Sequence, residues 1–119
     1  MSRVKRGVTT HRRHKKVLAL TKGHRATKHS LYRRAHESML KSLSYAYRHR
    51  RERKGDMRRL WILRISAASR AQGLTYGQFI DGLKKSRVEV NRKMLADMAV
   101  KEPEAFTNLV TIARGKIQD

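Results

Sequence analysis

The sequence predicts an all-α protein in which a long, basic helical N-terminal extension is followed by a small C-terminal helical bundle. Apolar residues recur at the three- and four-residue spacing of helices, and no stretch alternates as a half-buried strand would. The only proline is Pro103, so no earlier residue forces a helix to end. Basic residues crowd the first half of the chain, which favours an extension over a packed core. We expect the extension to cover residues 1–58 and the globular part to cover residues 59–119.

The first segment, residues 1–22, is basic and has too few apolar residues to bury a core. Its apolar side chains are Val4, Val8, Val17, Leu18 and Leu20. A short helix over residues 9–21 is compatible with this pattern. Because such a segment cannot offset the conformational entropy lost on folding, we expect it to be largely disordered in the free chain. We expect it to order only against a polyanion.

A long helix is predicted over residues 27–71. Two adjacent rows of side chains form a narrow apolar stripe on it, with Leu31, Ala35 and Met39 in one row and Leu40, Leu43 and Tyr47 in the other. Gly55 is the weak point of this helix, because a glycine in a helix interior costs about 1 kcal/mol relative to alanine. A bend or break at Gly55 is therefore an open alternative to one continuous helix.

The globular part begins where apolar side chains crowd the end of the long helix, at Leu60, Trp61, Leu63 and Ile65. Gly73 then provides a signal for the end of that helix. Thr75 and Gln78 have the three-residue spacing of a capping box, which predicts the start of the next helix. Within that helix the apolar positions match the helical period, at Tyr76, Phe79, Ile80 and Leu83.

Two further helices complete the predicted bundle. One covers residues 91–100 and carries Leu95 on its apolar side. The other opens at Pro103, which suits a first helical position, with Glu104 beside it to suit the positive helix end. It ends at Gly115. About 60 residues form this core, so the bundle is expected to be only marginally stable by itself.

The charge of the chain points to a polyanionic partner. The 119 residues include 30 Lys and Arg against 9 Asp and Glu, a formal net charge of +21. Residues 1–60 hold 20 of these basic residues and 3 of the acids, whereas residues 61–119 hold 10 and 6. Nucleic acid is the favoured partner, because its phosphates attract Lys and Arg regardless of sequence. A membrane is not, because no apolar run approaches the roughly 18 residues of a spanning helix.

Two basic clusters are the candidate binding residues. Arginine dominates the cluster between residues 48 and 59, and its guanidinium group grips phosphate in a bidentate manner. The other cluster is a basic tail that supplies affinity through counterion release. Tyr45 and Tyr47 could stack on exposed bases, the alternative being that they complete the apolar stripe. The predicted RNA-binding set is Arg3, Lys5, Arg6, Arg12, Arg13, Lys15, Lys16, Lys22, Arg25, Lys28, Arg33, Arg34, Arg48, Arg50, Arg51, Arg53, Lys54, Arg58 and Arg59.

Neither a metal site nor a catalytic site is predicted. His11 and His14, and His24 and His29, have spacings seen in zinc sites, but the chain has no cysteine and the histidines lie among cations. The acidic residue Glu37 is expected to pair with Lys41 four residues on. No glycine-rich phosphate loop and no nucleophile beside a base is present. We therefore expect no cofactor and no enzymatic activity. The lack of cysteine and of a visible signal peptide favours a cytosol-like compartment.

Several motifs in a fixed order resemble the bacterial-type large-subunit ribosomal proteins of the L-twenty family. They are VKRG at residues 4–7, HKKVL at 14–18, KG at 22–23, YAYR at 45–48 running on to Lys54, LWI at 60–62 followed by Arg64, Ile65, Ala67 and Ala68, FIDGLK at 79–84, and RKMLADMA at 92–99. The sequence departs from the family at His24, where Tyr or Phe is expected, and at Gly55, where a charged residue is expected. These departures weaken the expectation of a stacking contact at His24 and favour a bend at Gly55.

The resemblance implies a structural constituent of the large ribosomal subunit that binds 23S-type rRNA directly and supports early subunit assembly. It implies neighbouring large-subunit proteins as partners, a cytoplasmic location in the ribosome or an organelle matrix or stroma, and, in some members, repression of the protein's own mRNA. The residues alone leave open a histone-like or architectural DNA-binding protein. A membrane-binding amphipathic helix is disfavoured, because the apolar stripe is too small and broken.

Overall fold

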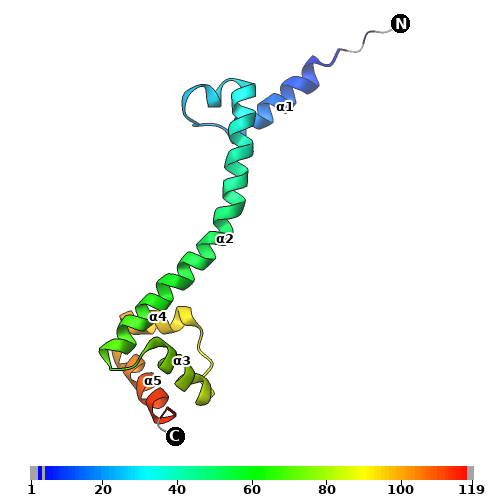
Figure 1. The fold of residues 1–119 in the computed structure, drawn as a ribbon. Helices are drawn as coiled ribbons and strands as arrows, with labels where there is room; N and C mark the ends of the chain where they lie inside the picture. The colour runs from blue at the N-terminus through cyan, green and yellow to red at the C-terminus, as the bar shows by residue number, and fades with distance from the viewer. Residues whose placement is uncertain (1–2, 4, 118–119) are drawn as a thin grey trace. The chain divides into compact units, whose positions relative to one another are not determined.

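A computed structural model describes residue 3 and residues 5–117, and all regular structure within these residues is helical (Figure 1). The elements in chain order are α1 (Gly7–Leu20), the 3-10 helix η1 (Ala26–His29), α2 (Tyr32–Ala71), α3 (Tyr76–Lys85), α4 (Arg92–Lys101) and α5 (Pro103–Gly115). The all-α prediction, with a long helix followed by a small helical cluster, is confirmed. The residues group into two compact units, an N-terminal unit that ends at Arg51 and a C-terminal unit that begins at Glu52.

In the N-terminal unit, α1 starts two residues before the range predicted for it. The Thr9 hydroxyl donates a hydrogen bond to the Arg6 carbonyl over 2.9 Å, which supports this early start. No residue of α1 is buried, in keeping with its few apolar side chains. The expectation that this segment orders only against a polyanion stays a prediction.

Packing between α1 and the residues that follow it was not predicted from the sequence. Thr21 and Ala35 are fully buried. The His14 ring stacks on the Tyr32 ring, with centroids 3.7 Å apart and an interplanar angle of 21°. Small side chains and ring stacking make this contact, so a search for large apolar residues does not find it.

The long helix begins later than predicted. Residues 26–29 form η1 instead, and α2 begins at Tyr32. Ala26 has φ +58° and Gly23 has φ +83°, and this left-handed backbone cannot continue an α-helix. Gly55 neither breaks nor ends α2, which is continuous by its hydrogen bonding from Tyr32 to Ala71. A Cβ added at Gly55 would meet nothing within 4 Å, so no close contact explains the glycine.

The predicted signals between α2 and α3 are confirmed. Gly73 adopts φ +81°, and the Leu74 amide donates to the Ser69 carbonyl over 3.0 Å, as in a Schellman motif. The Thr75 side chain accepts from the Gln78 amide at 3.3 Å, and the Gln78 side chain accepts from the Thr75 amide at 3.0 Å. Local sequence signals thus set the turn that starts the C-terminal bundle.

The core of the C-terminal unit lies where α3, α4 and α5 pack with the end of α2. The Phe79 and Phe106 rings are tilted against each other with centroids 5.1 Å apart. The buried cluster also includes Ile65 of α2, Leu95 of α4 and Val110 of α5. Gly82 lets α3 and α5 approach closely, since a Cβ there would lie 2.4 Å from the Ala113 carbonyl oxygen.

Two leucines predicted to crowd this core are instead exposed. Leu60 is 38% exposed and Leu63 is 66% exposed, whereas Trp61 packs partly against the cluster. The reason is helical periodicity, because Trp61, Ile65 and Ala68 share one face of α2 and Leu63 does not.

Three side-chain hydrogen bonds join elements of the C-terminal unit. The Arg114 guanidinium donates to the Gln72 carbonyl just beyond the end of α2, and the Gln72 amide group donates to the Thr107 hydroxyl over 2.9 Å. The Arg92 Nε donates to the Tyr76 hydroxyl over 2.8 Å, which joins α4 to α3. The first two hydrogen bonds join Gln72, just after α2, to α5, and the third joins α4 to α3.

Candidate nucleic-acid interface

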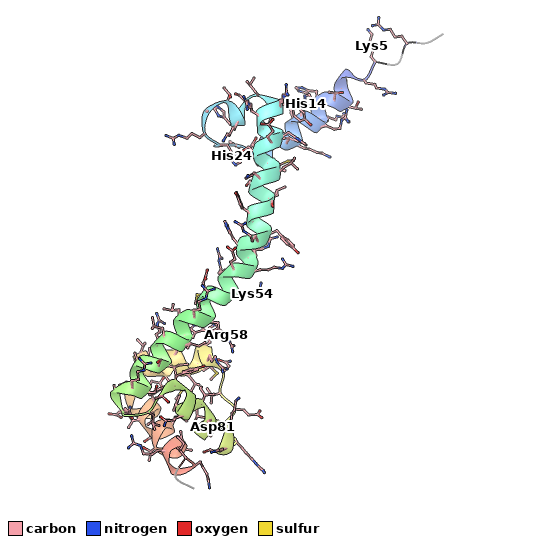
Figure 2. The ribbon with its side chains drawn as sticks, viewed as in Figure 1. Lys5, His14, His24, Lys54, Arg58 and Asp81 are labelled. Atoms are coloured by element: carbon pink, nitrogen blue, oxygen red, sulfur yellow. The ribbon has the colours of Figure 1, made fainter. Side chains whose placement is uncertain are left out.

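The central part of α2 carries its charged residues on an exposed stretch of helix. Every residue from 40 to 60 is exposed. The basic residues between 48 and 59 spread around the helix, because consecutive positions are rotated by about 100°. Figure 2 shows the side chains of Lys54 and Arg58 projecting from α2. A helix that is charged on several sides can be gripped by polyanion segments from several directions.

The predicted basic tail is also exposed. Each predicted binding residue from Arg12 to Lys28, on α1, on η1 and between them, is exposed. The Arg13 guanidinium lies 3.5 Å from the Thr10 hydroxyl on the same helix. Because the chain does not bury these cations, they are available to an external anion. Whether each of them contacts RNA stays a prediction.

Histidine side chains make several of the contacts within the N-terminal unit. His14 and His24 both lie in this unit (Figure 2). The His24 Nδ1 lies 2.8 Å from the Ser38 hydroxyl, which ties the turn after α1 to α2. The His29 Nδ1 lies 3.0 Å from the His24 carbonyl. These histidines therefore have structural roles that the sequence analysis missed, and the only signal was the unusual residue at position 24.

A depression of about 510 Å³ opens on this unit between η1 and the first turns of α2. Its lining consists of Lys28, Arg34, Glu37, Ser38, Lys41 and Ser42. The predicted pair between Glu37 and Lys41 is not the one observed, because the Glu37 carboxylate lies 3.6 Å from the Arg34 guanidinium instead. Lys41 is not among the predicted RNA-binding residues, although it lines this depression.

Tyr45 and Tyr47 are not buried by this chain, with exposures of 39% and 55%. The Arg51 guanidinium lies 3.8 Å from the centre of the Tyr47 ring, and the Arg48 guanidinium lies 4.9 Å from the centre of the Tyr45 ring. Such cation–π contacts hold the guanidinium groups beside the rings. The apolar stripe that these tyrosines were suggested to complete is itself exposed at Leu40 and Leu43. Base stacking by either ring stays a prediction.

Two kinds of site are absent from the described residues. Within residue 3 and residues 5–117, no group of three or more His, Asp or Glu side chains could hold a metal ion. None of the helices in this part of the chain is both long and apolar enough to cross a membrane. Two acids of the C-terminal unit pair with a lysine four residues on, Asp81 with Lys85 and Asp97 with Lys101, each at 3.2 Å.

Comparison with known proteins points to one family. The family model for ribosomal protein L20 matches residues 3–109. A large ribosomal subunit protein bL20 from Dehalococcoides mccartyi strain BAV1 is 65% identical over 106 residues, which is 89% of either chain. The bL20 protein of Moorella thermoacetica is 58% identical over 117 residues, or 98% of this chain and 97% of the relative. That of Thermomicrobium roseum is 60% identical over 114 residues, or 96% and 97%.

Proposed function

Because the chain belongs to the ribosomal protein L20 family, and is thus a structural, non-enzymatic constituent of the large ribosomal subunit, we propose that its basic N-terminal residues bind large-subunit rRNA directly. The observation that carries the proposal is the exposed run of residues 40–60 on α2. Tertiary packing usually stabilises a helix in a protein, and like charges one turn apart destabilise it. A polyanion that surrounds the run supplies tertiary packing and offsets the excess of basic over acidic residues in it.

We favour RNA over duplex DNA as that polyanion. Charge alone is compatible with a histone-like protein, because phosphates of either nucleic acid release counterions. The relatives, however, are named as proteins of the large ribosomal subunit. Family membership therefore supports rRNA, and neighbouring ribosomal proteins are the expected protein partners.

We expect binding of the full chain to deproteinised large-subunit rRNA to weaken steeply with salt. Binding that neutralises six to ten phosphates loses roughly 10³- to 10⁵-fold in affinity between about 50 and 200 mM salt. Filter binding or fluorescence anisotropy across this range measures the slope, with duplex DNA of equal length as the competitor. A slope worth only one or two phosphates, or stronger binding to the DNA, would contradict the proposal.

We propose that the protein acts in ribosomes of the cytoplasm, or of an organelle matrix or stroma, and that it has an early role in assembly of the large subunit. A chain whose basic N-terminal segment packs against rRNA must bind that RNA before other parts of the subunit cover the binding site. This assignment follows the family resemblance and the exposed arm together. The order in which proteins join rRNA during reconstitution measures it directly.

We also propose that the protein represses translation of its own mRNA through its C-terminal unit, as the resemblance implies for some family members. Excess purified protein should then reduce synthesis from its own mRNA in a translation extract, by several-fold, and leave an unrelated mRNA unaffected. Equal inhibition of both messages would show non-specific binding by the basic arm instead.

A further inference from the structure

The expected ion pair between Glu37 and Lys41 does not account for where the Lys41 side chain lies. The structure pairs Glu37 with Arg34 and places the Lys41 ammonium 5.7 Å from the centre of the Tyr45 ring. Lys41 is exposed and lines the depression between η1 and α2. Its charge is therefore available to a ligand that enters this depression.

Hydrogen bonds hold the wall of the depression that faces α2. The contact between the His24 ring and the Ser38 hydroxyl, at 2.8 Å, fixes the turn against the helix. The Leu31 amide donates to the Thr27 carbonyl over 2.9 Å at the junction between η1 and α2. Lys28 lies within this fastened segment, so its backbone is positioned before any ligand arrives. Preorganisation of this kind lowers the entropic cost of binding.

The lining carries a net positive charge in a concave place. Lys28, Arg34 and Lys41 contribute three cations, and Glu37 contributes one carboxylate that Arg34 already contacts. Concave surfaces of one charge sign focus the electrostatic field more strongly than a flat surface does. The Ser42 hydroxyl on the same lining can donate one hydrogen bond. Ammonium, guanidinium and hydroxyl groups together are ligands for a phosphate.

We propose that this depression is a binding site for one phosphodiester of the rRNA backbone, with Lys28 and Lys41 converging on the same phosphate. This inference rests on the proposed rRNA binding. It adds one fixed phosphate site to a basic N-terminal segment whose other charges are spread along the helices. Lys28 comes from η1 and Lys41 from α2, so one phosphate held between them also locks the turn onto the helix.

A double-mutant cycle tests whether the two lysines share one phosphate. The full chain, Lys28→Met, Lys41→Met and the double variant are titrated with deproteinised bacterial large-subunit rRNA at two salt concentrations. Methionine keeps most of the aliphatic stem and removes the charge. Each single variant should bind roughly 10-fold more weakly, as expected for one charge-assisted contact. The double variant should lose clearly less than the product of the two losses, because contacts to one phosphate are coupled.

Lys101→Met is the matched control, since it removes the same charge from a lysine that pairs with Asp97 at 3.2 Å. It should bind within about twofold of the unchanged protein, as expected for a lysine outside the interface. The phosphate site would be overturned if the two single losses in affinity multiplied in the double variant. It would also be overturned if the losses equalled that of Lys101→Met, or if they were seen only with duplex DNA. The steep salt dependence of the unchanged protein would still support rRNA binding in those cases. A shallow dependence in the unchanged protein would overturn both proposals together.

Discussion

Replacing Gly82 with alanine is expected to destabilise the C-terminal unit more than any other single methyl group added to a described glycine. The new Cβ would lie 2.4 Å from the Ala113 carbonyl oxygen and 2.9 Å from its Cα, both of them backbone atoms of α5. A side chain could rotate away, but here a whole helix must shift. Overpacking of this kind costs about 3 kcal/mol, and a bundle of this size supplies only roughly 3–5 kcal/mol in total.

Thermal unfolding of the full chain, followed by Trp61 fluorescence, measures this effect. Trp61 is the only tryptophan and packs against the C-terminal core, so its signal reports on that unit. Gly82→Ala should lower Tm by at least about 10 °C, because 1 kcal/mol shifts a small domain by about 4–8 °C. An unchanged Tm would mean that α3 and α5 do not approach as closely as described.

Gly77→Ala is the matched control on the same helix. A Cβ at Gly77 meets nothing within 4 Å, and the residue is exposed. Alanine has the higher helix propensity, so this variant should be stabilised by up to about 1 kcal/mol. Changes in stability of opposite sign for the two substitutions would separate steric crowding at Gly82 from the general effect of replacing a helical glycine.

The sequence allowed the C-terminal fold to be predicted nearly to the residue, because its signals are local. The capping box at Thr75, the helix stop at Gly73 and the proline at the start of α5 each act on the backbone within a few positions. Such signals do not depend on what the rest of the chain does. The exposure of Leu63 was not predicted, because apolar residues near the end of α2 were counted without regard to the side of the helix on which each lies.

The N-terminal unit was harder to predict, because its contacts join positions far apart in the sequence. The His14–Tyr32 stack and the His24–Ser38 contact need a turn with two left-handed residues, Gly23 and Ala26, and Ala26 carries no sequence signal for that conformation. The same difficulty applies to the depression. Its cations are visible in the sequence. That Lys28 and Lys41 line the same depression depends on the turn that brings η1 close to α2.

Replacing Arg48, Arg50, Arg51 and Arg53 together with glutamine should remove most of the affinity for rRNA. All four are exposed on α2, and glutamine is about as good a helix former as arginine, so the helix itself should persist. Loss of four phosphate contacts should lower the slope of log affinity against log salt by roughly 3. At about 150 mM salt, the affinity should fall by roughly 10²- to 10⁴-fold.

The same four positions changed to lysine provide the control, because charge is kept while the bidentate guanidinium fork is lost. This variant should retain the salt slope of the unchanged protein and lose about 10-fold in affinity, the equivalent of one good charged contact. Circular dichroism of each free variant checks that helix content is equal. If the glutamine variant bound as tightly as the unchanged protein, this stretch of α2 would not be the main rRNA contact. The arm would then have to hold RNA through α1 and the depression beside η1 instead.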